Sequence, residues 1–215
     1  MKEILFNVLA GFLGGLLVYL YQKFDEEKKS KNFIKENLKS SLKKLPSNFI
    51  HSIEVGMTMD KLKEFIGNPT FSTFIDEKEI FDLDNQFNIN QYKFLNCELI
   101  VFNSENSLLG FILKPYIENY FEFERFDSAN EQLNIGGYIV DDTFTNFDEI
   151  LYEKSMRDTW FGIIEYYGRI GGFNYYCYYG ETGIFADNPT LEDLKGEIIS
   201  GYGVASHKTF FKYYG

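Results

Sequence analysis

Histidine and cysteine are scarce in this chain of 215 residues. It has two of each, and they are His51, His207, Cys97 and Cys177. Neither histidine belongs to a metal-binding pair at helical spacing, so we expect no histidine-based metal site. Two cysteines in a chain of this length make no disulfide framework, and both lie in apolar or aromatic runs where a buried, unreactive thiol is the usual occupant.

The sequence also lacks the motifs of nucleophilic catalysis and phosphate binding. It contains no Gly-x-Ser-x-Gly turn, and no cation stands next to either cysteine in the sequence to lower its pKa. The glycines of Gly168-Arg-Ile-Gly171-Gly172 lack the lysine of a phosphate loop and its strand-to-helix context. We therefore expect no catalytic, cofactor-binding or metal-binding residues, and no enzyme.

A long apolar run is present near the N-terminus. Residues 4–21 carry no formal charge, and at about 1.5 Å per residue a helix of this length nearly crosses a hydrocarbon core of roughly 30 Å. Tyr19 and Tyr21 suit the headgroup level at its end. The run predicts a retained transmembrane anchor over residues 1–24. The alternative is a cleaved secretory signal, which the bulky residues after the run disfavour.

Lysines follow this run closely. Their excess on the C-terminal side predicts a single-pass protein of the cell inner membrane, with its domain facing the cytoplasm. Residues 25–46 are expected to form a lysine-rich juxtamembrane helix or linker. The lysines expected to contact the membrane surface are Lys23, Lys28, Lys29 and Lys31.

Two glycines lie four residues apart in the predicted anchor. Gly11 and Gly15 would share one face of a helix, where small residues let two backbones approach closely in a bilayer. This spacing predicts membrane-helix packing at that face and a weak homodimer.

Charge divides sharply along the chain. Residues 51–215 contain 12 basic and 27 acidic residues, a formal charge of −15, whereas residues 1–50 have a charge of +4. A domain of charge −15 is repelled by phosphate backbones, so we expect no nucleic-acid partner. The densest acidic cluster lies within residues 141–149, and a solvated surface is its simplest interpretation. The alternative is a metal-dependent enzyme or toxic effector, for example in phage defence, that uses Asp141, Asp142, Asp148 and Glu149.

Residues 47–215 are predicted to form one acidic, aromatic-rich domain of the α+β class. Thr58 is a good N-cap, and Gly67 followed by Pro69 ends a short helix between them. A second helix is allowed by the apolar residues of 147–167. The segment Thr190-Leu-Glu-Asp193 resembles a helix start with a reciprocal acidic cap.

Antiparallel hairpins are expected between these helices. A turn-type cluster at 103–106 separates two runs rich in aromatic and aliphatic residues, which is a hairpin signal. The strands expected on these grounds are 92–102 with 107–113, 120–126, 173–179 with 183–185, and a last one from Gly201.

Aromatic residues are abundant, with 16 tyrosines and 23 phenylalanines. The densest run is Tyr175-Tyr-Cys-Tyr-Tyr179. Such a run covers the half-buried face of a strand, which is the simpler interpretation. The alternative is a tyrosine-lined groove of a small-ligand receptor.

One segment resembles a known domain family. Its residues are Val55-Gly-Met-Thr58, Leu62, Ile66-Gly67, Pro69, Tyr92-x-Phe94, Leu99-x-Val101 and Leu108-Leu-Gly-Phe111. About residues 53–113 resemble the SmpA/OmlA domain of the small lipoprotein of the β-barrel assembly machine. The resemblance implies a helix packed on an antiparallel sheet and a role in protein contact without a catalytic centre. The family's lipobox cysteine is absent, and the role of residues 114–215 is left open.

These observations together predict a non-enzymatic, membrane-tethered protein-interaction or sensor module. Its expected partners are the lipid bilayer, a protein of unknown identity and a second copy of the chain. No cofactor is expected. A tethered binder needs only a stable domain and a contact surface, whereas an enzyme needs converging reactive groups that this sequence does not offer.

Overall fold

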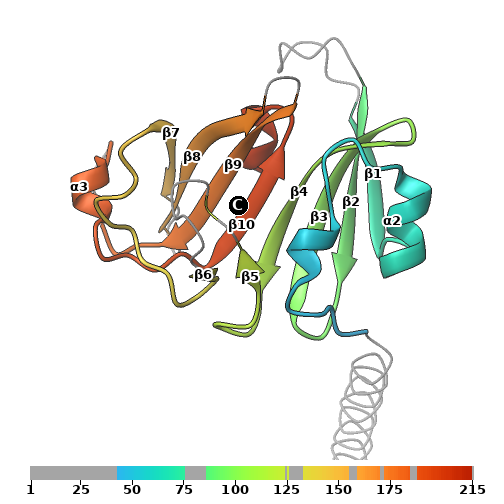
Figure 1. The fold of residues 1–215 in the computed structure, drawn as a ribbon, viewed down its shortest axis with the longest axis horizontal. Helices are drawn as coiled ribbons and strands as arrows, with labels where there is room; N and C mark the ends of the chain where they lie inside the picture. Colours follow the sequence, from blue (N-terminus) through green and yellow to red (C-terminus); the bar gives the residue numbers. More distant parts are fainter. Residues whose placement is uncertain are drawn as a thin grey trace, which may run out of the picture. The chain divides into compact units, whose positions relative to one another are not determined.

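An eight-stranded antiparallel sheet organises the chain (Figure 1). The computed structural model describes residues 43–75, 86–123, 125, 133–154, 159–169, 172–184 and 188–214. The strands follow the order β1-β2-β3-β4-β10-β9-β8-β7 across the sheet. The strands of this sheet are β1 (Phe71–Ile75), β2 (Phe87–Lys93), β3 (Cys97–Ser104), β4 (Ser107–Pro115), β7 (Phe147–Lys154), β8 (Thr159–Arg169), β9 (Gly172–Glu181) and β10 (Gly201–Ala205).

The sheet consists of two meanders joined by one late strand. Strands β1 to β4 pair in chain order, and so do β7 to β9. Strand β10 then pairs with β4 on one side and with β9 on the other. The closing strand is only five residues long, yet all five are buried, so it holds the two meanders together through the middle of the core.

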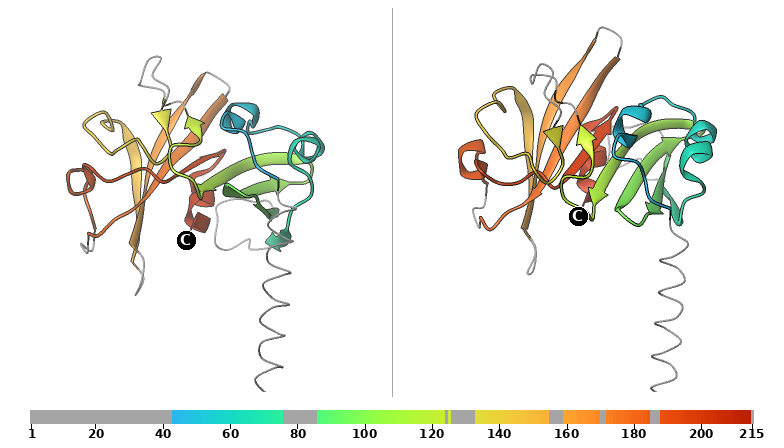
Figure 2. Two further views of the ribbon diagram at one scale, coloured as in Figure 1. Left: turned by 90° about the horizontal axis from the view of Figure 1, so that it is seen from below. Right: turned by 60° about the horizontal axis from the view of Figure 1, so that its bottom comes forward.

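Both faces of the sheet are covered. One face packs under η1 (Phe49–Ser52), α2 (Met59–Ile66), α3 (Leu191–Leu194) and the small hairpin of β5 (Glu122–Phe123) and β6 (Leu133–Asn134). The other face packs under the C-terminal 3₁₀ helix η2 (Lys208–Tyr214), which contributes Phe210 and Phe211. Figure 2 shows the sheet from two further directions. We call the face under η1, α2, α3 and the β5–β6 hairpin the helix face, and the face under η2 the C-terminal face.

The short helix predicted after Thr58 is confirmed as α2. The Thr58 hydroxyl accepts a hydrogen bond from the Lys61 N–H, and the Gly67 N–H donates to the Lys63 carbonyl at the other end. Gly67 has a φ of 89°, a left-handed conformation that favours glycine. Leu62 and Ile66 are buried as expected, but Phe65, predicted on the same face, is half exposed.

Local signals also predicted three other features correctly. The hairpin around residues 103–106 is β3 with β4, turning through Glu105 at a φ of 50°. The strand expected over 92–102 is not continuous, because β2 ends at Lys93 and β3 begins at Cys97. Thr190 and Asp193 form the reciprocal cap of α3, and hydrogen bonds from Thr190 lower the pKa of Asp193. The last strand from Gly201 is β10.

The α+β assignment is wrong, because the structure is mostly antiparallel β-sheet. The described residues contain two α-helices, of eight and four residues. Residues 147–154 and 159–167, predicted as one helix, lie in β7 and β8. In both strands apolar residues point to both faces: Ile163 joins the core of the helix face and Ile164 that of the C-terminal face. A strand buried on both sides, as β8 is, loses its alternation, so its pattern cannot be told from a helix. Strand β7 lies at the edge of the sheet, and of its residues only Leu151 is buried.

Two strand predictions also need correction. The run 173–179 does not form a hairpin with 183–185, because β9 continues to Glu181 and pairs with β8 and β10 instead. Of the strand expected over 120–126, only Glu122–Phe123 is a strand, and it pairs with β6.

The structure does not support a single-pass membrane protein. None of the helices in the described ranges is long and apolar enough to cross a bilayer. The run 4–21 on which that prediction rested lies outside the described residues, as do Gly11, Gly15 and the four membrane-surface lysines. Residues 43–46, the described end of the expected juxtamembrane helix, are not helical.

Tyr92 offers a test of packing on the helix face. Its side chain is 1% exposed, its hydroxyl has no hydrogen-bond partner among the described residues, and burial raises its pKa to about 12. A buried, unpaired hydroxyl costs about 1–3 kcal/mol, so Tyr92→Phe is expected to leave the free energy of unfolding unchanged or raise it by about 1 kcal/mol. Urea unfolding measures this.

The matched control is Tyr179→Phe. The Tyr179 hydroxyl is also buried, but it donates to the Phe211 carbonyl at 3.1 Å. Its removal is expected to lower stability by about 1 kcal/mol. A larger loss for Tyr92→Phe than for Tyr179→Phe would show that the Tyr92 hydroxyl is satisfied in the folded protein.

Candidate functional site

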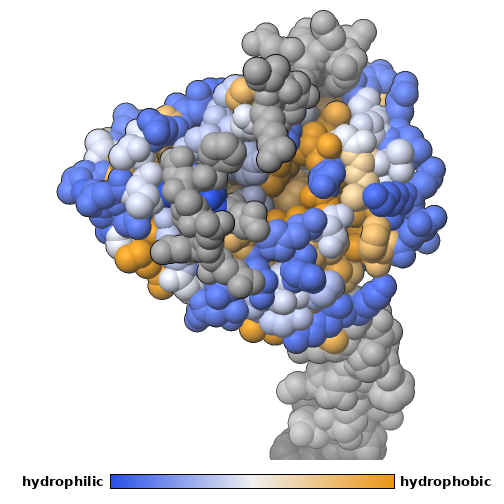
Figure 3. All heavy atoms as spheres, viewed as in Figure 1, coloured by the Kyte–Doolittle hydropathy of each residue, from blue (hydrophilic) through white to orange (hydrophobic). Residues whose placement is uncertain are grey.

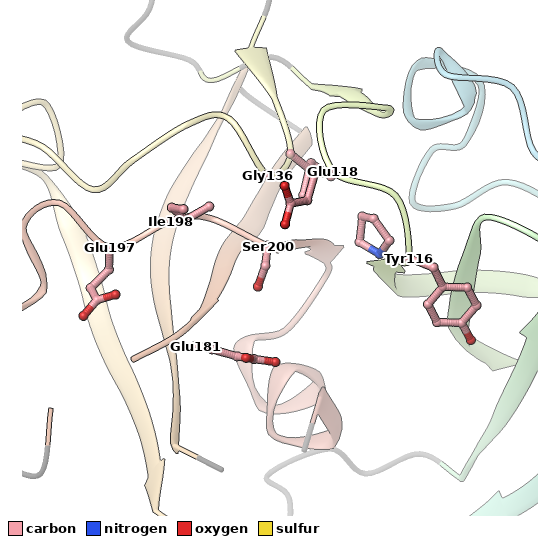
Figure 4. Close-up of a pocket in the computed structure, with 9 residues that line it drawn as sticks. Tyr116, Glu118, Gly136, Glu181, Glu197, Ile198 and Ser200 are labelled. Atoms are coloured by element: carbon pink, nitrogen blue, oxygen red, sulfur yellow. The ribbon is translucent and has the colours of Figure 1, made fainter. Parts of the chain in front are cut away.

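A pocket of about 390 Å³ lies where the central strands β4, β9 and β10 begin or end (Figure 4). Four chain segments that are far apart in the sequence contribute its walls. The lining residues are Pro115, Tyr116, Glu118, Ile135, Gly136, Glu181, Glu197, Ile198 and Ser200.

Backbone hydrogen bonds hold three of these walls together. The Asn119 N–H donates to the Ile135 carbonyl at 2.8 Å, and the Gly136 N–H donates to the Ile199 carbonyl at 2.7 Å. Gly136 has a φ of 93°, and a side-chain carbon at this position would come within 3.0 Å of the backbone of Asn119. Glycine is therefore required for both the turn and the close approach.

The pocket is acidic. Glu118, Glu181 and Glu197 line it, and no lysine, arginine or histidine is among the lining residues. Glu197 accepts a hydrogen bond from the Thr182 hydroxyl at 2.7 Å, whereas Glu118 and Glu181 have no ion-pair partner in the described ranges. Figure 4 shows the Glu118 side chain pointing toward Ser200, with Glu181 below it.

Exposed apolar side chains flank the pocket. Tyr116 is 55% exposed, Ile117 43%, Ile139 46% and Ile198 51%. Tyr116 and Ile198 line the pocket, Ile117 lies between two lining residues, and Ile139 is the antiparallel bridge partner of Ile198. We call these four residues the apolar rim. Partial burial and the nearby Glu98 raise the pKa of Tyr116.

The four rim residues are among the eleven large apolar side chains that are exposed in the described part of the chain. Much of the face drawn in Figure 3 is hydrophilic, and hydrophobic residues gather on it in a few areas. Single exposed apolar residues need no explanation, but several around a hollow are typical of a contact site.

The predicted acidic cluster does not converge. Asp142 pairs with Lys195 at 2.5 Å, whereas Asp148 and Glu149 pair with Lys208 at 2.8 and 2.9 Å. Asp141 accepts a hydrogen bond from the Thr143 N–H at 3.0 Å. Asp142 is thus a partner of Lys195, whereas Asp148 and Glu149 are partners of Lys208, and these contacts raise the pKa of both lysines. No group of three or more potential metal ligands occurs in the described part of the chain.

The histidines and cysteines are also spread apart. His51 is exposed within η1, and the ring of His207 forms a hydrogen bond with the Thr209 hydroxyl at 2.7 Å. Cys97 and Cys177 are buried and free, as predicted. Burial raises the pKa of Cys97 to about 12 and that of Cys177 well above its ordinary value, which makes both poor nucleophiles.

The tyrosine run belongs to the core and not to a ligand groove. Tyr178 and Tyr179 are buried on opposite faces of β9, the first in the core of the helix face and the second in that of the C-terminal face. Tyr176 and Tyr175 pack against the same two cores. The simpler interpretation of this run, strand coverage, is therefore confirmed.

One buried ion pair was not predicted from the sequence. Arg125 and Glu165 are fully buried and joined by two hydrogen bonds, of which the Arg125 Nε to Glu165 Oε2 contact measures 3.1 Å. The guanidinium also donates to the Tyr138 hydroxyl, to the hydroxyl and carbonyl of Thr143, and lies 3.7 Å from the centre of the Phe144 ring. Burial alone would lower the pKa of Arg125, but its bonds to Glu165 raise it.

This pair ties the loops over the helix face to β8. Arg125 follows β5, Tyr138 and Thr143 belong to the connection between β6 and β7, and Glu165 lies within β8. Because each guanidinium nitrogen already has a protein partner, the role of the pair is structural. The available signal was a charge in each of two aromatic runs, 120–126 and 160–167. Arg125 is two residues from Phe123 and four from Phe121, so an alternating strand places all three on one face, which is the buried one.

No family model, curated protein or solved structure matches this chain. The resemblance of residues 53–113 to the SmpA/OmlA domain therefore stays a prediction.

Proposed function

We propose that residues 43–215 form a non-enzymatic protein-interaction domain that contacts its partner through the apolar rim and the pocket inside it. The observation that carries this proposal is the position of Tyr116, Ile117, Ile139 and Ile198, which leave large apolar surfaces in water around a hollow. Burying such side chains against a partner is favourable at about 25 cal/mol per Å². Tyrosine in particular is enriched among the residues that dominate binding energy.

The geometry around the rim supports contact more than chemistry. The rim and pocket are built on connections at the ends of central strands that are held by backbone hydrogen bonds, which makes the surface largely preformed. The acidic residues suggested as an enzyme centre are distributed between Lys195 and Lys208. A binding role needs no group other than those present.

The proposal predicts that a double variant of the rim loses its partner. Tyr116→Ser with Ile198→Ser is expected to lower the recovery of a captured partner at least about tenfold, because each truncation of a central interface residue costs about 1–2 kcal/mol or more. The measurement is affinity capture of the full-length chain from its own cells, quantified by mass spectrometry.

The matched control is Tyr166→Ser with Phe173→Ser. These two rings are similarly exposed, at 47% and 45%, but lie on the β8–β9 hairpin. Circular dichroism and the melting temperature verify that both double variants fold. Equal partner recovery by the wild type and the rim variant would contradict the proposal, as would an equal loss in both variants.

A further inference from the structure

The two end strands of the large sheet differ in how they are protected. Strands β1 and β7 lie at opposite ends of the sheet, and within the described part of the chain each pairs with one neighbour only (Figure 1). An end strand leaves a row of backbone N–H and C=O groups without a strand partner. Natural proteins discourage further pairing at such an edge with charged side chains and bulges, among other devices.

Strand β7 has both of these devices, and β1 has neither. Four of the eight residues of β7 are charged, and its register shifts between Phe147 and Glu149. Strand β1, Phe71–Ile75, contains no charged residue, no proline and no glycine, and its pairing with β2 is regular. The edge of β1 is therefore open to a further strand.

We propose that two copies of the chain pair along the outer edge of β1, antiparallel and around a twofold axis at Thr73. Every copy offers the same open strand, so one contact satisfies the edges of both copies. Strand β1 contributes no residue to the pocket or to the apolar rim, so this contact is independent of the proposed function.

Charge allows this pairing at β1 and opposes it at β7. The chain has a formal charge of −11, so two copies repel each other over much of their surfaces. An antiparallel pair of two β1 strands brings no charged side chains of the strands together. Two fully overlapped β7 strands would place Asp148 opposite the partner's Glu153, and like charges directly opposite each other are destabilising.

The sequence of β1 is complementary to itself in this register. With Thr73 opposite its own copy, Phe71 lies opposite the partner's Ile75. Phe71, Thr73 and Ile75 share one face of the strand, and Ile75 packs against the core of the C-terminal face. Phe71 is the most exposed of the large apolar side chains in the described ranges, at 58%. In the dimer it covers the partner's Ile75, which continues that core across the twofold axis.

The other face of β1 gains an aromatic contact. Phe74 is 55% exposed there, opposite the partner's Ser72. The two copies of Phe74 are then diagonal neighbours, and aromatic side chains reach each other across such a diagonal. Pairing therefore removes both phenylalanines of β1 from water.

The inner side of β1 is held in place, so its outer edge is preformed. Five residue pairs in regular register join β1 to β2, and the Ser72 hydroxyl donates to the Asn90 side-chain oxygen at 2.7 Å. Little ordering is then needed when a second strand adds. Because each copy has one open edge, the assembly closes as a dimer, and its small contact area makes it a reversible one.

The first test measures self-association of the full-length chain by sedimentation velocity over a range of concentrations. Phe71→Lys puts an unpaired charge opposite the partner's Ile75 and is expected to weaken the dimer at least about tenfold. The matched control, Phe147→Lys, makes the same change on β7, where the ring is 37% exposed. It is expected to leave the dissociation constant within about twofold. Circular dichroism and the melting temperature verify that both variants fold.

The second test locates the twofold axis with Thr73→Cys. The natural Cys97 and Cys177 are buried, so the added thiol is the accessible one within the described ranges. Because the two added cysteines lie opposite each other, a short thiol-specific cross-linker is expected to join two chains. Glu153→Cys, exposed on the β7 edge, is the control and is expected to remain uncross-linked.

Three results would overturn the proposed dimer. A wild-type chain that stays monomeric at every concentration has no such contact, and equal dissociation constants for Phe71→Lys and Phe147→Lys place the contact elsewhere. Absence of a cross-link through residue 73 in a protein that still dimerises excludes the antiparallel register. If the wild type is monomeric and Phe71→Lys loses a captured protein, the edge of β1 takes a strand of a different partner. None of these variants changes Tyr116 or Ile198, so partner capture through the apolar rim succeeds or fails separately.

Discussion

Replacing Glu165 by alanine is expected to lower the free energy of unfolding by about 3–5 kcal/mol. The substitution leaves the guanidinium of Arg125 fully buried without its counter-charge, and an uncompensated charge in the interior is among the costliest single changes. Because Arg125 also holds Thr143 and Tyr138, the loops over the helix face should loosen as well. Urea unfolding measures the loss, and hydrogen exchange locates it.

The control is the double variant Arg125→Met with Glu165→Met. Apolar residues of similar volume leave no buried charge, and replacing a whole buried pair is often neutral or stabilising. We expect the double variant to be more stable than Glu165→Ala, with a strong coupling energy in the double-mutant cycle. Independent, additive losses would mean that the two charges do not depend on each other.

Replacing Phe210 by alanine is also expected to cost about 3–5 kcal/mol. The ring is 1% exposed on the C-terminal face, 4.9 Å from the ring centre of Phe102 and 5.2 Å from that of Phe87. Its removal leaves a cavity between η2 and the sheet. Thermal and urea unfolding should both report a large loss.

Lys212→Ala serves as the control for the same 3₁₀ helix. Lys212 is exposed within η2, so its truncation is expected to change stability by no more than about 0.5 kcal/mol. A small effect of Phe210→Ala, similar to that of Lys212→Ala, would mean that η2 does not seal the C-terminal face in solution.

Features governed by neighbouring residues were predictable from the sequence. The α2 helix depends on Thr58 and Gly67, and the β3–β4 hairpin depends on a turn of four consecutive residues. Caps and tight turns are stabilised by contacts within a few residues, so their signal is present in a short window.

Features governed by burial on both faces of a strand were not predictable from the sequence. Residues 147–167 have apolar side chains suited to a helix stripe, and only the covering of both faces of β8, with β7 paired along its edge, makes strands the favoured structure. The cover on the C-terminal face comes from Phe210 and Phe211, far away in the sequence. Tertiary packing overrides local propensity in such segments.

The sequence by itself determined the caps of α2 and α3, the β3–β4 turn, the burial of both cysteines and the acidic charge. Only the tertiary structure brought Glu118, Glu181 and Ser200 to one pocket and separated Asp142 from Asp148. The physical reason is the pairing of β10 with β4 and β9. The pairing of β10 with β4 joins segments about 90 residues apart in the sequence. Proximity of that kind depends on the register of a whole sheet, which no short stretch of sequence encodes.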